Sequence, residues 1–146
     1  MTTVSKLIEN KSNEIWAVGP DDFIFDAVKL MDEKGIGALA VLLDGALIGI
    51  VSERDCARKV ILENIATKEV SVKAIMTRQV YYTDPDQDID ECLSVMTQHH
   101  IRHLPVMKDE KMISMISMGD VVKEILAEQQ FKIDHLEHYI SWEESF

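Results

Sequence analysis

Two segments of the chain carry a serine three residues before an aspartate, Ser52 with Asp55 and Ser117 with Asp120. Each pair follows an apolar run and precedes a predicted helix, so it stands at a strand-to-helix junction. In one interpretation the pair forms a variant of the capping box and satisfies free backbone N–H groups of the first helical turn. In the other the junction binds a ligand, because a helix N-terminus attracts anions and an aspartate can accept two hydrogen bonds from a ribose cis-diol. The pairs therefore mark two candidate sites.

Two observations favour ligand binding at these junctions. The serine and the aspartate recur at equivalent positions of a repeated pattern, and Gly49 would let a ligand approach the backbone closely. In the second copy Ser114 replaces this glycine, and Gly119 replaces Arg54, which removes one phosphate partner. We therefore expect one strong site and one weaker or differently selective site.

A basic pair, Arg102 and His103, precedes Leu104, Pro105 and Val106. The planar fork of an arginine suits phosphate oxygens, and the histidine could donate a hydrogen bond to the same group. A solvated sheet edge is the alternative, because proline often marks such edges. The corresponding residues of the first copy, 37–41, carry no charge. The two candidate sites therefore differ in chemistry, and the sequence leaves open which of them the basic pair serves.

An internal repeat positions these residues. Residues 15–60 match residues 80–125 at an offset of 65 positions, without a gap over 46 residues. Such self-similarity indicates a repeated structural unit, so it constrains the fold class more than any single predicted helix or strand does. Two copies of a unit that cannot close its own core should pack together, and the space between related halves is a natural place for a ligand.

Each copy is predicted to form a strand, a helix, two strands and a second helix. Extended runs at residues 15–18 and 80–83 end at Pro-Asp turns. Apolar residues then recur at helical spacing, and Met31 and Met96 fall at core-facing positions. The second helices begin near the two Ser-x-x-Asp pairs, which places both pairs at helix starts.

Turns, a leading segment and a tail complete the prediction. Asp44-Gly45 predicts a tight hairpin, whereas residues 108–111 lack a glycine and predict a longer or differently shaped turn. Residues 4–9 resemble residues 72–77, so a similar segment leads into each copy. The last helix is expected to continue to Tyr139 or Trp142.

Composition excludes several classes of function. With 146 residues and 47% apolar content, the chain is expected to form one globular module. The net charge of −11 opposes binding to nucleic acid or to anionic membranes. No run approaches the roughly 20 apolar residues of a membrane span, and the opening residues lack signal or transit character, so we expect a cytoplasmic protein. Cys56 and Cys92 fall at apolar positions of the repeat and are interpreted as free, buried thiols.

With its doubled Gly/Ser-x-x-Ser-x-x-Asp junction, its Pro-Asp turns, Ile75-Met76-Thr77 and the RHLPV segment, the chain resembles a tandem pair of cystathionine β-synthase (CBS) domains, or Bateman module. The resemblance covers about residues 3–126. It implies an α+β fold of two β-α-β-β-α repeats, packed pseudo-symmetrically with ligand clefts between them. We place repeat 1 with its leading segment at residues 3–65, repeat 2 with its own at 66–126, and a helical tail at 127–146.

The resemblance also implies roles for individual residues. The aspartates would hold ribose hydroxyls, the serines would meet phosphate or ribose, the basic residues would neutralise phosphate, and the backbone at two strand positions would flank adenine. One threonine would contact the base, and Val18 replaces it in the first copy. The aspartates are Asp55 and Asp120, the serines are Ser52 and Ser117, and the basic residues are Arg54, Arg102 and His103. The two strand positions are Ala38 and Leu104, and the threonine is Thr83.

These roles predict a non-catalytic regulatory module. The ligand would be AMP, ADP, ATP, NAD or S-adenosylmethionine, and NADP is disfavoured because the ribose aspartate repels a 2′-phosphate. The chain would form a homodimer and signal to a separate effector protein. A ligand-free dimeric scaffold, in which the acidic tail meets a partner, is the alternative. We expect no enzyme, because no nucleophile has a positioned base. We also expect no metal site, because His103 falls on a strand while His99 and His100 end a helix, and because structural zinc usually needs four ligands, which His135 and His138 with Glu137 do not supply.

Overall fold

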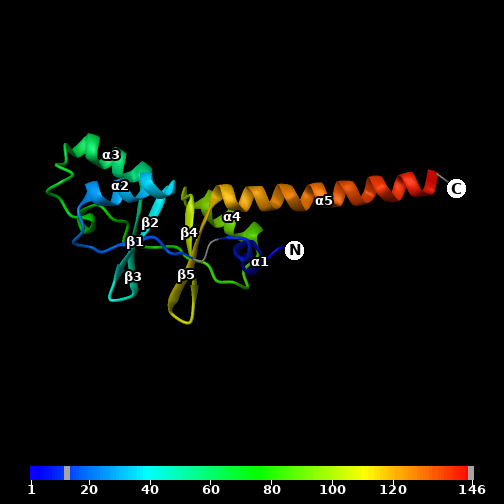
Figure 1. Ribbon diagram of the computed structural model, residues 1–146, viewed down its shortest axis with the longest axis horizontal. Helices are drawn as coiled ribbons and strands as arrows, with labels where there is room; N and C mark the ends of the chain where they lie inside the picture. The colour runs from blue at the N-terminus through cyan, green and yellow to red at the C-terminus, as the bar shows by residue number, and fades with distance from the viewer. Residues whose placement is uncertain (12–13, 145–146) are drawn as a thin grey trace. The chain divides into compact units, whose positions relative to one another are not determined.

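The computed structural model of the chain describes residues 1–11 and 14–144 (Figure 1). The predicted α+β class is confirmed, with helices and two small sheets. In chain order the elements are α1 (Val4–Glu9), β1 (Ala17–Val18), α2 (Ile24–Lys34), β2 (Ala38–Leu43), β3 (Ala46–Ser52), α3 (Glu53–Glu63), the 3-10 helix η1 (Val72–Ala74), α4 (Ile89–Gln98), β4 (His103–Lys108), β5 (Lys111–Ser117) and α5 (Met118–Glu144).

The chain forms two compact units, each assembled from separated stretches. The α5 unit joins Met1–Ser12, Thr83–Leu104 and Ile116–Phe146, and the sheet unit joins Asn13–Tyr82 and Pro105–Met115. The leading segment of the first copy thus belongs with the core of the second. The boundaries expected from the sequence, 65/66 and 126/127, divide the chain into consecutive segments. Each compact unit instead combines stretches from both copies of the repeat.

Backbone hydrogen bonds show how each leading segment attaches to the other copy. In the α5 unit, the Val4 N–H donates to the Gln87 carbonyl at 2.8 Å. In the sheet unit, the Val72 N–H donates to the Asp22 carbonyl at 2.7 Å. These bonds are equivalent, because Val4 and Val72 match in the leading segments while Gln87 and Asp22 match in the copies. The leading segments are therefore exchanged between the two copies.

The sheet unit contains a three-stranded sheet in the order β1-β2-β3 and most of the two-stranded sheet β4-β5. Strands β1 and β2 are parallel, and β2 and β3 are antiparallel. Helix α2 ends at Gly35, whose φ of 64° is left-handed and favours glycine at a helix C-terminus. Met31 is 2% exposed, as its core-facing position predicts. The core residues are Val18, Ile24, Ala27, Met31, Leu39, Val41, Val51, Cys56, Val72, Ile75 and Met76.

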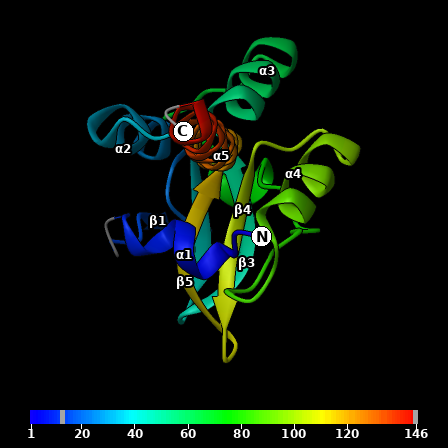
Figure 2. The same cartoon turned by 90° about the vertical axis from the view of Figure 1, so that its right-hand side faces the viewer.

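The α5 unit is helical around α5. Helices α1 and α4 both contact α5 near its start, and Figure 2, which looks along α5, shows them on one side of it. Helix α4 buries Ile89, Cys92 and Met96 of its predicted apolar stripe, whereas Leu93, the fourth residue of the stripe, is half-buried. The Thr2 hydroxyl donates to Glu128 Oε2 at 2.9 Å, which ties the N-terminal segment to α5. Helix α5 extends through Tyr139 to Glu144, which confirms that the second helix of this copy continues; the side chain of Trp142 and residues 145–146 lie outside the described residues.

Two expectations about local structure are wrong. The turn between β4 and β5 is neither longer nor different, because Asp109 and Glu110 have φ values of 52° and 65°, as Asp44 and Gly45 have 50° and 84°. The twist of paired strands favours a turn with two positive φ values, and Glu110 adopts it without a glycine. Residues 80–82 lie outside any strand, and Thr83 forms only an isolated bridge.

Both cysteines are free and buried, as the sequence predicts. Burial raises the pKa of the Cys56 thiol to about 11, and the neighbouring Asp55 adds to the shift. Burial also raises the pKa of Cys92. Both thiols are therefore protonated at neutral pH and act as small apolar side chains.

Candidate functional site

A backbone hydrogen bond joins the start of α5 to the start of β4. The Met118 N–H donates to the Arg102 carbonyl at 2.7 Å. The first copy has the equivalent bond, from the Glu53 N–H to the Gly37 carbonyl at 2.9 Å. The repeat therefore builds the same backbone frame at both junctions, and the frame of the second copy brings the basic pair beside Ser117.

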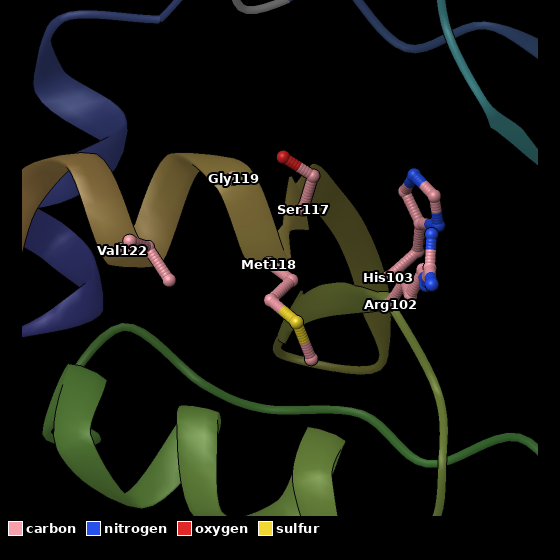
Figure 3. A pocket seen from close by; sticks show the side chains of 6 residues that line it. All are labelled: Arg102, His103, Ser117, Met118, Gly119 and Val122. Atoms are coloured by element: carbon pink, nitrogen blue, oxygen red, sulfur yellow. The ribbon is translucent and has the colours of Figure 1, made fainter.

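A pocket of about 460 Å³ opens at this second junction. Figure 3 shows Arg102 and His103 adjacent to each other at the start of β4, with Ser117 and Met118 at the turn into α5. The lining residues are Arg102, His103, Ser117, Met118, Gly119 and Val122. The structure thus brings three of the predicted site residues, Arg102, His103 and Ser117, to one pocket within the α5 unit.

Asp120 forms a complete capping box with Ser117. The Ser117 N–H donates to Asp120 Oδ2 at 2.9 Å, and the Asp120 N–H donates to Ser117 Oγ at 3.0 Å. Lys11 Nζ donates to the same Oδ2 at 2.6 Å, in an ion pair whose side chains are 32% and 33% exposed. The capping interpretation is therefore confirmed at this junction, and a lysine is added to it.

The ionisable groups around Asp120 perturb one another. Burial tends to raise the pKa of Asp120, but hydrogen bonds from Lys11 and Ser117 outweigh it and hold this pKa below its usual value. Burial lowers the pKa of His103; Asp120 opposes this shift, and Lys11 and Arg102 reinforce it. At neutral pH this junction therefore holds an ionised carboxylate on Asp120 and a neutral imidazole on His103, and a nearby anion would help to protonate the imidazole.

The first junction is simpler. Ser52 caps α3, and its Oγ accepts the Asp55 N–H at 3.1 Å. Arg54 is exposed and Asp55 is half-buried. Ala38, predicted to flank adenine through its backbone, is 4% exposed at the start of β2. These residues share the α3 junction of the sheet unit, whereas the other predicted site residues belong to the α5 unit.

Two predicted site residues of the second copy are buried. Thr83 is 7% exposed, and its hydroxyl shares a hydrogen bond with Cys92 Sγ at 3.4 Å. Leu104 is 1% exposed within β4. Neither side chain lines the pocket, so contact with a base at these positions would depend on the backbone or on movement of Thr83.

Gly49 has a packing role that the sequence did not reveal. A Cβ atom at this position would lie 2.6 Å from Met76 Sδ and 3.1 Å from the Thr77 carbonyl oxygen. Real Cβ atoms do not come that close, so the residue keeps β3 against residues 76–77 of its own unit. The expectation that this glycine admits a ligand therefore has a structural alternative.

Sequence reasoning missed Lys11, Met118 and Val122. Lys11 lies in the leading segment, 109 positions from Asp120, so no local spacing connects the two. The resemblance between the leading segments was the available signal, but it does not reveal that the segments are exchanged. Met118 and Val122 are apolar residues of a helix and carry no signal of their own.

Among the described residues, no group of three or more His, Cys, Asp or Glu side chains could hold a metal ion. Within the same part of the chain, no helix is both long and apolar enough to cross a membrane.

Comparison with known proteins shows the same repeat. A family model of the CBS domain matches residues 6–62 and 72–127. The chain is similar to the mitochondrial CBS domain-containing protein CBSX3 of Arabidopsis thaliana, with 36% identity over 149 aligned residues that cover 95% of this chain and 72% of the relative. It is also similar to the solved structure of a CBS-domain protein from Burkholderia ambifaria MC40-6, with a TM-score of 0.84 and 47% identity over 88% of this chain and 96% of that one.

A more distant likeness extends the fold comparison. The CBS domain pair of protein MJ0100, solved in complex with 5′-methylthioadenosine and S-adenosyl-L-methionine, has a TM-score of 0.77 and 22% identity over 88% of this chain and 98% of that one. At this identity the likeness concerns the fold. The two segments that match the family model contain both Ser-x-x-Asp junctions and follow the internal repeat. The chain therefore belongs to the CBS-domain family and carries two CBS domains in tandem.

Proposed function

We propose that this chain is a non-catalytic regulatory module that binds an adenosyl ligand and passes a change of conformation to a partner. The observation that carries the proposal is the pocket of about 460 Å³ that Arg102 and His103 line together with the start of α5. Its volume lies within the range of small-molecule sites. A ligand that binds one conformation more tightly than another would shift their equilibrium, which is the physical basis of regulation.

The charges around this pocket favour a ligand with a phosphate. Arg102 is exposed and can form two parallel hydrogen bonds with phosphate oxygens. Gly119 places no side chain at the helix start, where the positive end of the helix dipole attracts an anion. Lys11, paired with Asp120, adds a further cation nearby. AMP, ADP, ATP and NAD therefore fit better than S-adenosylmethionine, whose sulfonium is positive.

Asp120 is the proposed ribose partner, and Lys11 is its competitor. The lysine and the Ser117 N–H already donate to Asp120 Oδ2. A ribose would use the remaining acceptor capacity of the carboxylate, or the lysine would turn to the incoming phosphate. Exchange of Lys11 from the carboxylate to a phosphate would couple ligand binding to the leading segment, and this coupling gives the ligand a route to a change of conformation.

The first junction is proposed as the weaker site. Contacts to phosphate and ribose are proposed for Ser52, Arg54 and Asp55. A backbone contact to adenine is proposed for Ala38. In the second copy Leu104 and Thr83 keep the corresponding adenine roles. The first junction has one exposed arginine where the second has the basic pair and Lys11, so the attraction for a phosphate is smaller there.

A homodimer and a separate effector protein belong to this proposal, as does a cytoplasmic location. The complex of the MJ0100 CBS domain pair with 5′-methylthioadenosine and S-adenosyl-L-methionine supports adenosyl binding by this fold. The alternative is a ligand-free dimeric scaffold, which the exposed apolar residues of α5 favour, since they offer a surface to a partner.

A thermal-shift panel tests the proposal on the full chain. The ligands are AMP, ADP, ATP, NAD, NADP, S-adenosylmethionine and adenosine. A ligand at about 100 times its dissociation constant adds roughly 2.7 kcal/mol to the free energy of unfolding and raises the melting temperature by several degrees. We expect shifts with phosphorylated adenosyl ligands that exceed the shift with adenosine. No shift with any ligand would favour the scaffold.

A further inference from the structure

The second half of α5 is exposed to solvent over the part whose side chains the structure describes, up to Ile140. Every residue from 131 to 140 is exposed, and α5 continues well past α1 and α4 of its own unit (Figure 1). Its exposed apolar residues include Leu126, Ile133, Leu136 and Ile140, at 63%, 48%, 58% and 53%. We propose that this half of α5 forms a parallel, two-stranded coiled coil with a second copy of the chain.

The spacing of the apolar residues carries the proposal. Leu126, Ile133 and Ile140 are seven residues apart, and Leu136 lies three residues after Ile133. These positions are a, a, a and d of a heptad repeat, which forms a single seam that faces a partner helix. The other d positions, Gln129 and Glu143, are polar, so the apolar seam rests on the three a positions and Leu136. Apolar residues that recur every 3.5 residues pack best against a helix whose apolar residues recur at the same spacing. Helix α5 of a second copy of the chain has this spacing.

The charges beside the seam specify a parallel arrangement. Lys132 occupies a g position, and Glu137 occupies the e position five residues later. In a parallel pair, g of one helix lies beside e of the next heptad on the other. Lys132, whose Nζ lies 3.8 Å from Glu128 Oε1 of its own helix, would also meet Glu137 of the partner subunit, and the same contact would form twice. An antiparallel pair would bring g beside g and e beside e, without this match of charges.

One exposed aromatic residue of α5, Phe131, lies away from the seam. Phe131 is 73% exposed and occupies an f position, on the outside of the proposed pair. Its ring stacks on His135 of the same helix, with ring centroids 6.5 Å apart and an interplanar angle of 9°. Phe131 therefore provides an internal control, because any general stickiness of α5 would involve this residue at least as much as the seam.

This inference deepens the homodimer proposed above by naming the surface that forms it, and it does not depend on ligand binding. Residues 126 and 140 stand about 21 Å apart along the helix, at 1.5 Å per residue. In a parallel pair each would face its own counterpart, at a Cα distance that a disulfide can span. In an antiparallel pair centred on Ile133, each would lie about 20 Å from its counterpart.

Cysteine crosslinking of the full chain tests the arrangement. Leu126→Cys and Ile140→Cys are each oxidised mildly, and the covalent dimer is followed on a denaturing gel. We expect both to crosslink on the order of tenfold or more faster than Phe131→Cys, because a shared dimer raises the local thiol concentration well above that in bulk solution. The unmodified chain gives the background from Cys56 and Cys92, which are buried.

Light scattering of the uncrosslinked variants completes the test. Crosslinking at 126 and 140 no faster than at 131 would overturn the coiled coil, even if the mass were that of a dimer, since other helices would then hold the copies together. A monomer for the unmodified chain at about 100 µM would overturn it as well. The thermal-shift panel reports on the ligand proposal alone, so the failure of one proposal can be distinguished from the failure of the other.

Discussion

The starts of α3 and α5 share a backbone frame but differ in their charges. Each start donates an N–H to the carbonyl just before the neighbouring strand, at 2.9 Å from Glu53 and 2.7 Å from Met118. Around α5 the frame carries Arg102 and His103, and Lys11 reaches it from the leading segment. Around α3 the equivalents of the basic pair are Gly37 and Ala38. Repetition thus preserves the backbone geometry, and a few side chains give each junction its own chemistry.

The difference also shows where the chemistry of the second junction originates. Arg102 and His103 belong to the repeat, whereas Lys11 belongs to the exchanged leading segment. An exchanged segment therefore allows one copy to alter the electrostatics of the other copy's junction without any change within the repeat.

The largest expected effect comes from removing the arginine of each junction. Arg102→Ala should weaken the binding of AMP or NAD about 10- to 100-fold, because a charge-assisted hydrogen bond to phosphate is worth about 1.5–3 kcal/mol. Arg54→Ala should weaken it less than about fivefold, as expected for an exposed charge. Isothermal titration calorimetry measures both.

Adenosine is the control ligand for this pair of variants. It lacks a phosphate, so Arg102→Ala should leave its affinity unchanged. A larger loss for Arg54→Ala than for Arg102→Ala would reverse the comparison and identify the α3 junction as the stronger site.

The next effect concerns Gly49 and its equivalent, Ser114. Gly49→Ser should destabilise the chain by about 1–3 kcal/mol, because the new Cβ would collide with Met76 and with the Thr77 carbonyl in a packed core. Ser114→Gly should cost about 1 kcal/mol or less, the usual effect of glycine in a strand. Urea unfolding of both variants measures the difference. If Gly49→Ser unfolds like the unmodified chain but loses ligand binding, the glycine serves ligand approach instead of packing.

Much of the fold follows from the sequence because its signals are local. The helical spacing around Met31 and Met96 predicts α2 and α4, and Asp44-Gly45 predicts the first hairpin. The second hairpin shows the limit of such signals. Asp109-Glu110 adopts the same turn without a glycine, because the twist of the flanking strands decides the turn and the sequence preference is only a few tenths to about 1 kcal/mol.

The candidate site was predictable only in part, for a related reason. The basic pair and Ser117 could be placed together because the repeat aligns each of them with a known element. Lys11 could not, because its contact with Asp120 depends on the exchange of leading segments. A nonlocal exchange leaves no periodicity in the sequence, so only the three-dimensional arrangement reveals this ion pair.

The smallest effect, and the sharpest test of the ion pair, is the response of the two junctions to acid. Asp120→Asn should lower the free energy of unfolding at pH 7 by about 1 kcal/mol, since the pair with Lys11 is close but about one-third exposed. Asp55→Asn should cost about 0.5 kcal/mol or less, because the backbone N–H of residue 55 still bonds to Ser52 Oγ. Thermal unfolding should therefore separate the two by a few degrees.

The pH dependence of the free energy of unfolding shows how the charge of Asp120 contributes to stability. The pKa of Asp120 is held below its usual value of 3.8 in the folded chain, so its contribution is complete above that pH and is lost as the pH falls through the folded pKa. The stability difference between the unmodified chain and Asp120→Asn should thus shrink below about pH 4. Lys11→Met should reproduce this pattern, because it removes the main cause of the lowered pKa. A difference that stays constant down to pH 2 would mean that the carboxylate contributes through its shape and its capping hydrogen bonds, and that the charge of Lys11 is not what distinguishes the α5 junction.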